Sequence, residues 1–280
     1  VSLGLQTTAV IYKDGTLWMC GRNDYGQIGD STRTNRNAFV KVMDNVGIAV
    51  AGWNSTYAIK NDGTLWAWGC NDYGQLGDGT QVTRLQPVKV MDGVKLVSAK
   101  GNNAAAVKTD GTLWIWGDNS YGQINNVSDS LSKIPVNIMN GVSSVSIGDG
   151  SVMVVTTDGS LKGWGRNTYG QLGDGTDNNT ISPVSIINDV SAIEQGWQNT
   201  IAMKQDGSVW TWGLNNRGAL GNGTQSSQGV YSSSPQQVLE GRNPNQLIGA
   251  EIEEEELRLD ILEKAVVPMR PKPLLAEYTH

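Results

Sequence analysis

The sequence contains one histidine, His280, and it is the last residue. A Ser-His-Asp triad or a Cys-His pair needs an imidazole beside its nucleophile, so neither arrangement is available away from the terminus. Only two cysteines are present, Cys20 and Cys70, and they lack the CxxC spacing of a zinc site. We therefore expect no disulfide framework, no metal and no cofactor.

Charge is also scarce, because only 17% of the residues are Asp, Glu, Lys or Arg, and the net charge is −6. Nucleic-acid binding depends on clustered Lys and Arg, and no basic run is present, so no nucleic-acid partner is predicted. No run of 18 apolar residues occurs either, which excludes membrane insertion through an apolar helix.

What the chain has in abundance is glycine, 35 residues, arranged with a strict period. An Asp-Gly pair recurs every 48 residues, beginning at Asp14, Asp62, Asp110, Asp158 and Asp206. A period of 20 to 50 residues is typical of a solenoid, a propeller or another array in which each unit buries its apolar face against its neighbours. We therefore expect five structural repeats.

Each repeat is predicted to hold four short strands. In the second repeat the second strand is Thr56–Lys60 and the third is Thr64–Gly69, joined by an Asp-Gly hairpin turn. The first strand is represented by Val142–Ile147, and the fourth is expected to follow a proline such as Pro87. Four antiparallel strands repeated radially make the blade of a β-propeller, so the fold class is all-β.

Tryptophans occupy two columns of the third strand, two residues apart and therefore on one face. We interpret them as packing between units rather than as chemistry. The residues assigned this structural role are Trp66, Trp68, Trp114, Trp116, Trp164, Trp210 and Trp212.

The pattern Asp-Gly-Thr-Leu-Trp-x-Trp-Gly-x-Asn-x-Tyr-Gly-Gln-Leu-Gly-Asp-Gly-Thr resembles the repeat of the regulator of chromosome condensation (RCC1-like) family over residues 1 to about 240. The resemblance implies a β-propeller, usually of seven blades. Five repeats predict either a smaller ring or part of a larger one. Because the sequence starts at Val1 inside a repeat, we expect a processed chain or a fragment.

The composition changes after the repeats, so we predict two regions, a propeller over residues 1–243 and an acidic tail over residues 244–280. A short C-terminal helix is expected from about Ala250 to Ala265, stopped by Pro268, with a loose proline-containing terminus after it. Its apolar stripe would dock on the propeller or on another chain.

Candidate binding residues come from positions where the repeats differ. The turn after the first strand carries Trp53 and Trp197, followed by Asn54 and Gln198, and aromatic residues on loops at one rim are suitable anchors for a protein partner. The alternative is that each Trp packs on its own loop. Asp30, Asp78 and Asp174 lie in Gly-Asp loops that lack the ligand pattern of an EF-hand, so we interpret them as turn residues.

The function predicted from the sequence is a non-enzymatic scaffold that binds a protein through its rim loops. An alternative, implied by the family resemblance, is guanine-nucleotide exchange on a small GTPase. A third is an enzyme with an acidic site in the propeller channel. The Asn- and Gly-rich repeats with few Lys residues are typical of a bacterial exported array, so an extracellular or cell-surface location is the expectation.

Overall fold

A computed structural model describes residues 1–124, 129–224 and 229–241. Contacts between residues divide the chain into two units, Val1–Glu240 and Gly241–His280. The predicted tail helix lies outside the described residues. The described residues include no helix long and apolar enough to span a membrane.

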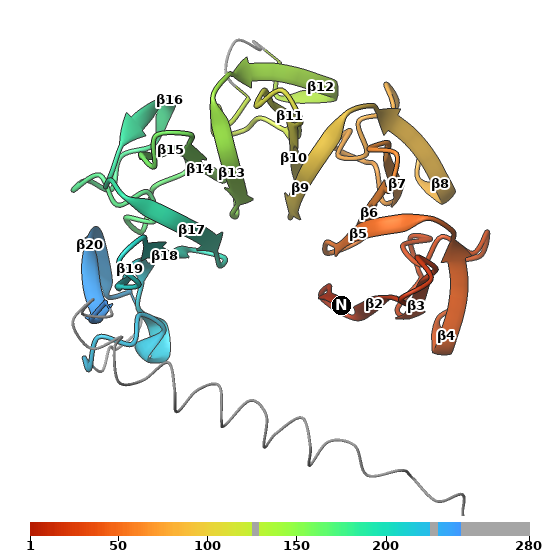
Figure 1. The fold of residues 1–280 in the computed structure, drawn as a ribbon, viewed down its shortest axis with the longest axis horizontal. Coiled ribbons are helices and arrows are strands. Elements are labelled where there is room, and N and C mark those ends of the chain that lie inside the picture. Colours follow the sequence, from red (N-terminus) through yellow and green to blue (C-terminus); the bar gives the residue numbers. More distant parts are fainter. Residues whose placement is uncertain (125–128, 225–228, 242–280) are drawn as a thin grey trace, which may run out of the picture. The chain divides into compact units, whose positions relative to one another are not determined.

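The first unit consists of five four-stranded antiparallel sheets, which we call blades 1 to 5, so the predicted all-β class is confirmed. Figure 1 shows the first strand of each blade innermost and the fourth outermost. The strands are β1 (Ser2–Leu3), β2 (Thr7–Ile11), β3 (Leu17–Gly21) and β4 (Arg36–Met43) in blade 1; β5 (Val46–Ala51), β6 (Ser55–Lys60), β7 (Leu65–Gly69) and β8 (Arg84–Met91) in blade 2; β9 (Val94–Lys100), β10 (Asn103–Lys108), β11 (Leu113–Asp118) and β12 (Leu131–Met139) in blade 3; β13 (Val142–Ile147), β14 (Ser151–Thr156), β15 (Leu161–Gly165) and β16 (Thr180–Ser185) in blade 4; and β17 (Val190–Gln195), β18 (Asn199–Lys204), β19 (Val209–Leu214) and β20 (Tyr231–Leu239) in blade 5.

The Asp-Gly hairpins between the second and third strands are closed by side-chain hydrogen bonds. In blade 2 the Asp62 carboxylate accepts from the Thr64 backbone N–H at 2.9 Å and from the Thr64 hydroxyl at 2.7 Å. Gly63 supplies a φ of +79°, which glycine adopts without a Cβ clash. The Trp66 indole N–H then donates to Thr64 Oγ1 at 2.9 Å, which fixes this half-buried ring beside its own turn.

The core lies between the blades. We call the side of a blade that meets the next blade along the chain its forward face, exemplified in blade 1 by Ala9, Leu17 and Met19. The side that meets the preceding blade is its backward face, exemplified in blade 2 by Ala58 and Trp68. All five side chains are buried, with exposed fractions of at most 1%. A repeat is therefore stable only when stacked on its neighbours.

In blades 2 to 5, one tryptophan of the backward face bonds to the preceding blade. The indole N–H of Trp116 donates to the backbone carbonyl of Gln75 at 2.7 Å, and that of Trp68 donates to the carbonyl of Gln27 at 2.9 Å. Trp164 and Trp212 repeat the contact with Gln123 and Gln171, respectively, at 2.9 Å. A buried indole needs such a partner, and the contact fixes the register of one blade on another.

The fourth strands begin earlier than expected. Pro87 is the fourth residue of β8 rather than its start, since the strand begins at Arg84. Pairing between β7 and β8 shifts register there: Ala67 pairs with Val88 and Gly69 with Arg84, so Pro87 falls in the irregular stretch. A missing N–H is tolerated at a bulge on an outer strand, which explains the position.

Candidate interaction site

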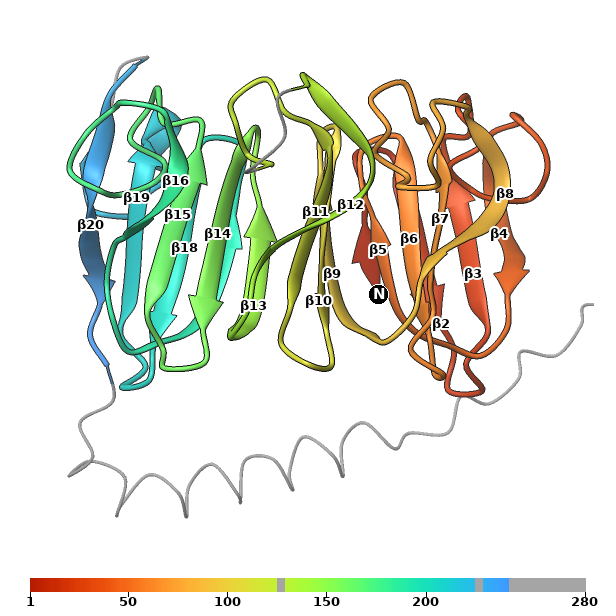
Figure 2. The same cartoon turned by 90° about the horizontal axis from the view of Figure 1, so that it is seen from above.

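The turns between first and second strands and the long loops between third and fourth strands emerge at the same end of the blades. In blade 1, for example, the last residue of β3, Gly21, pairs with the first residue of β2, Thr7. We call this the turn end; its turns are residues 4–6, 52–54, 101–102, 148–150 and 196–198. Figure 2 shows the strands running side by side between the two ends.

The long loops at the turn end are each organised around one asparagine, which is buried in blades 1, 2, 4 and 5 and half-buried in blade 3. In blade 2 the Asn71 side-chain oxygen accepts from the Leu76 N–H at 3.0 Å, while its amide donates to Asp78 Oδ1 at 3.0 Å. Asp78 is paired with Arg84 at 2.6 Å. Partial burial alone would raise the pKa of Asp78, but hydrogen bonds from Thr80 and Arg84 outweigh it and lower the pKa. These oxygens are therefore engaged by the protein's own donors, as expected for a turn residue.

The two turn tryptophans meet, although they belong to blades 2 and 5. The rings of Trp53 and Trp197 are stacked, with centroids 4.6 Å apart and planes inclined by 27°. Trp53 is half-buried, whereas Trp197 keeps 54% of its surface exposed. Aromatic pairs of this offset-stacked kind contribute about 0.5–1.5 kcal/mol beyond the area that they bury. The stack therefore holds the exposed Trp197 side chain in one orientation.

Asn54 and Gln198 directly follow Trp53 and Trp197 in the sequence, and both residues are partly exposed. The Asn54 side-chain oxygen is buried and has no hydrogen-bond partner among the described residues. The backbone carbonyls of Asn54 and Gln198 accept from the N–H groups of Cys70 at 2.8 Å and Leu214 at 2.7 Å, respectively. Each turn is thus anchored to the end of its own third strand, which limits its movement.

A lysine that the sequence analysis did not single out joins the same region. The Lys100 ammonium donates to the backbone carbonyl of Gln195, linking blade 3 to blade 5. Burial lowers the pKa of Lys100, and the nearby charge of Glu194 opposes that shift. The sequence could have drawn attention to Lys100, because it stands at a position of the repeat that is glycine in the other four repeats, for example Gly52 and Gly196.

Blade 4 contributes an ion pair to the turn end. Arg166 Nη1 donates to the Asp149 carboxylate at 2.6 Å, and its guanidinium lies over the Tyr121 ring at 5.2 Å from the centroid. Asp149 stands in the column of Trp53 and Trp197. The same position of the repeat therefore holds an ion-paired carboxylate, Asp149, in blade 4 and the stacked rings of Trp53 and Trp197 in blades 2 and 5.

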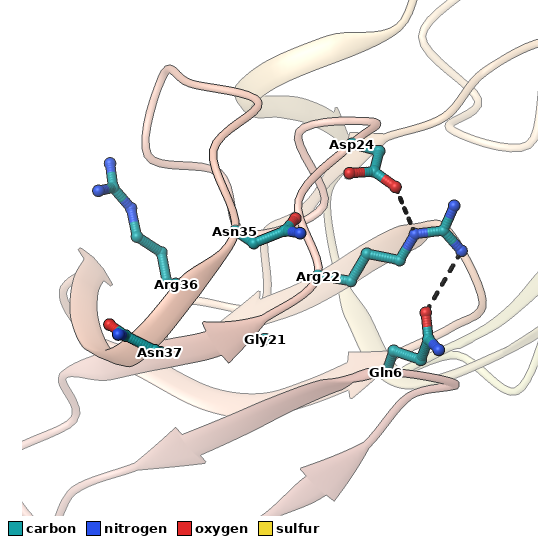
Figure 3. A pocket seen from close by; sticks show the side chains of 7 residues that line it. All are labelled: Gln6, Gly21, Arg22, Asp24, Asn35, Arg36 and Asn37. Carbon is teal, nitrogen blue, oxygen red and sulfur yellow. Dashed lines mark hydrogen bonds and ion pairs between the residues drawn. The ribbon is translucent and has the colours of Figure 1, made fainter.

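An open groove of about 660 Å³ lies at the turn end of blade 1, lined in part by Gln6, Arg22, Asp24 and Arg36. Figure 3 shows Arg22 between Asp24 and Gln6, with hydrogen bonds of 2.6 and 3.4 Å, and Arg36 pointing away. Arg36 is paired with Asp30 instead. Since both guanidinium groups are neutralised within the blade, the groove does not present a concentrated positive charge to a ligand.

The structure thus brings together Trp53 and Trp197, which the sequence places three repeats apart. The seven tryptophans assigned a structural role lie in the third strands at the blade interfaces, with Trp68, Trp116, Trp164 and Trp212 fully buried and Trp66, Trp114 and Trp210 half-buried. In the described ranges no three side chains of His, Cys, Asp or Glu lie close enough to hold a metal ion.

A family model for the RCC1-like domain matches residues 1–253. Among solved structures, human WBSCR16 superposes with a TM-score of 0.76 at 23% identity, covering 85% of this chain and 66% of that protein. Yeast RCC1 (Prp20), solved with Kap60 bound, gives a TM-score of 0.72 at 17% identity, with coverages of 86% and 60%. Prp20p from Saccharomyces cerevisiae, characterised for binding to Gsp1p and histones, gives 0.72 at 19% identity, with coverages of 86% and 62%.

No curated protein sequence matches the chain. The chain spans less than two thirds of the length of these three structures. Identities below 25% support the fold alone, whereas the family model covers most of the sequence. On that match, and on five blades built from one repeat, the chain belongs to the RCC1-like domain family.

Proposed function

We propose that this protein is a non-enzymatic interaction module that binds a protein partner through its turn end, with Trp53 and Trp197 as anchors. The observation that carries the proposal is the stack of these two rings, which leaves Trp197 54% exposed. Tryptophan is enriched among the few interface residues that contribute most of the binding energy. An aromatic side chain already held in one orientation loses little conformational freedom when a partner covers it.

The surroundings of the stack suit a protein surface. Asn54 and Gln198 follow the two tryptophans in the sequence and are partly exposed, so polar residues adjoin the two apolar rings. An apolar centre with a polar rim is the usual anatomy of a specific interface. The turns are also tied to their strands by the backbone hydrogen bonds of Asn54 and Gln198, which favours a preformed site.

We infer a binding role rather than catalysis because charged groups of the turn end are engaged with one another. Asp78 is bound to Arg84, and Asp149 is bound to Arg166, each at 2.6 Å. A general acid or base needs a group that can donate or accept a proton directed at the substrate. Carboxylates that already accept from guanidinium groups serve instead to hold the loops in place.

The proposal is tested by affinity capture from the source organism with three immobilised forms of the full chain. These are the unmodified chain, the double variant Trp53→Ala, Trp197→Ala, and Tyr12→Ala as a matched control. Tyr12 is also 54% exposed but lies in the hairpin at the opposite end of the blades. A partner retained by the unmodified chain and by Tyr12→Ala, and lost by the double variant, is the expected result. Equal retention by all three forms would show that the stack is not the anchor.

A second candidate is regulation of a small GTPase by nucleotide exchange, which the family resemblance implies. It is favoured by the superposition on Prp20p, which was characterised for binding to Gsp1p. The measurement is the rate of release of a fluorescent guanine nucleotide from a panel of small GTPases. Acceleration that is lost in the double variant would assign exchange to the turn end, and no acceleration for any member would remove this candidate.

A further inference from the structure

The fourth strand of each blade has one edge with which no described strand pairs. Every sheet ends at its fourth strand, and Figure 1 shows β4, β8, β12, β16 and β20 outermost. The free N–H and C=O groups of an outer edge can pair with a strand of another chain unless a residue there prevents it. The residues along these edges therefore decide which of them can bind.

One position separates β4 from the other outer strands. In blade 1 it is Phe39, which directly precedes Val40, the partner of Met19 in β3. The residues at the same position of the ladder in blades 2 to 5 are Pro87, Pro135, Pro183 and Pro235. Phe39 is 43% exposed, whereas the prolines are half-buried. Because the register shifts at this point in every blade, the proline and not the bulge distinguishes the other blades from blade 1.

The hydrogen bonds of blade 4 show which way this position points. The Ile186 N–H donates to the Leu161 carbonyl at 2.9 Å, so the N–H of Ile186 faces the third strand. In an antiparallel ladder, alternate residues direct their N–H and C=O groups to the same side. Val184 therefore also faces inward, where it pairs with Gly163, and Pro183 faces outward. A proline at this position removes an outward N–H and leaves the ladder within the blade intact.

In blade 1 the same alternation leaves a donor on the outer edge. Val40 occupies the position of Val184 and faces β3, so Phe39 and Lys41 direct their N–H and C=O groups outward. Proline removes the first of these donors in each of the other blades. The edge of β4 thus keeps both donors and adds an exposed aromatic ring.

We propose that the outer edge of β4 is a homodimerisation surface, on which β4 of a second copy of this chain adds as an antiparallel strand. The Phe39 N–H donates to the carbonyl of the partner's Lys41, and the N–H of the partner's Lys41 donates to the Phe39 carbonyl. Because the arrangement is two-fold symmetric, the same pair of hydrogen bonds forms twice and the dimer is closed. The surface includes neither Trp53 nor Trp197, so the inference goes beyond the proposed function.

The side chains of β4 select one register for this pairing. Placing Val40 opposite the partner's Val40 brings each Phe39 ring opposite the ammonium of the partner's Lys41, which is a favourable contact. A register that places Lys41 opposite the partner's Lys41 sets like charges against each other. A register that places Phe39 opposite the partner's Phe39 uses fewer outward groups, because the ladder is irregular between Arg36 and Val40.

A second copy is the occupant that this edge specifies. A strand from another protein would need a donor and an acceptor spaced as in Phe39 and Lys41, and a cation opposite the phenyl ring. Every copy of this chain carries that set on β4. The ion pair of Lys41 with Asp44, at 2.6 Å, is exposed and holds the lysine only weakly, so the ammonium can turn to the partner.

The proposal is tested by analytical ultracentrifugation of the full chain from about 1 μM to about 1 mM, because one strand edge buries less surface than a standard interface and should associate weakly. The mass is expected to rise from monomer to dimer within that range. Phe39→Pro introduces the residue that blades 2 to 5 carry and removes one donor from each strand, so it should raise the dissociation constant at least about tenfold. Ile134→Lys is the matched control, since Ile134 is 59% exposed on β12 beside Pro135, and it should dimerise as the unmodified chain does.

Two charge variants test the register. In Phe39→Lys each new ammonium lies opposite the partner's Lys41, so dimerisation should weaken at least about tenfold. In Phe39→Glu opposite charges meet, so the dissociation constant should stay within about threefold of the unmodified value. Hydrogen exchange of the Phe39 and Lys41 amides should slow as the concentration rises. A monomer at every concentration would overturn the proposal, as would a dimer that Phe39→Pro leaves intact or one that forms without slowing this exchange.

Discussion

Close approach of neighbouring blades can be tested at Gly77. Its φ is +74°, and a Cβ there would lie 2.8 Å from Nε1 of Trp116, the buried indole of the next blade. Trp116 cannot turn away, because its N–H is bonded to the Gln75 carbonyl at 2.7 Å. Gly221 is the matched control, since it occupies the same column in blade 5 with a φ of +65° and has no described atom within 4 Å.

The expected cost of Gly77→Ala has two parts. An L-residue in the left-handed region costs about 1–2 kcal/mol, and this part applies to both glycines. Overpacking against a fixed indole adds about 1–3 kcal/mol, and this part applies to Gly77 alone. The free energy of unfolding should therefore fall by roughly 2–5 kcal/mol for Gly77→Ala and by about 1–2 kcal/mol for Gly221→Ala.

Urea unfolding followed by tryptophan fluorescence measures the difference. The two variants should be compared under identical conditions, with slopes of the transition checked for equality, because arrays can lose cooperativity. Equal destabilisation by the two substitutions would refute the reasoning. It would mean that glycine is needed at position 77 only for its backbone conformation and not because the next blade lies so close.

Three further predictions concern single side chains and the tryptophan stack. Hydrogen bonds from the Thr156 hydroxyl and from Ser160 lower the pKa of Asp158 to about 2. The stability that this carboxylate contributes is therefore present above the unfolded pKa of about 3.9 and is lost as the pH falls toward 2. A carboxyl NMR titration of Asp158 with a midpoint near 4 would contradict this. Tyr57→Phe removes a buried hydrogen bond of 2.7 Å to the Gln75 carbonyl and should lower the free energy of unfolding in urea by about 1 kcal/mol. Burial raises the pKa of the Tyr57 phenol in the native protein, so the phenol should not ionise at pH 10. Unchanged stability, or ionisation of Tyr57 at pH 10, would argue against the contact. A double-mutant cycle over Trp53→Ala and Trp197→Ala should give a coupling of about 0.5–1.5 kcal/mol in unfolding free energy, and additive effects would show that the rings do not stack in solution.

The fold was predictable because one local pattern recurs at a fixed interval. The Asp-Gly turn and the alternating apolar residues of Thr64–Gly69 predict a hairpin without reference to the rest of the chain, and five repetitions predict five blades. Local patterns were less informative at the fourth strand. Pro87 is expected to start this strand, but the strand begins earlier, at Arg84, because a bulge removes the need for an N–H at Pro87.

The candidate site was predictable as residues but not as a geometry. Trp53 and Trp197 stand out because other repeats have different residues in their column, yet nothing local indicates that rings three repeats apart are stacked. Their contact depends on the accumulated rotation from blade to blade, which the sequence does not encode at either turn. Lys100 could have been identified by its glycine column, although its partner, the Gln195 carbonyl, depends on the same long-range arrangement.

The central claim, that a protein partner binds at the turn end, is tested most directly by site-specific photo-cross-linking. A photoreactive residue is placed either at Gln198, next to Trp197 in the sequence, or at Lys13, an exposed residue in a hairpin at the opposite end of the blades. Each chain is irradiated in a lysate of the source organism, and adducts are identified by mass spectrometry. The account predicts a discrete protein adduct from Gln198 that disappears when Trp197→Ala is added, and no such adduct from Lys13. An adduct from Lys13 alone, or one from Gln198 that persists without Trp197, would contradict it.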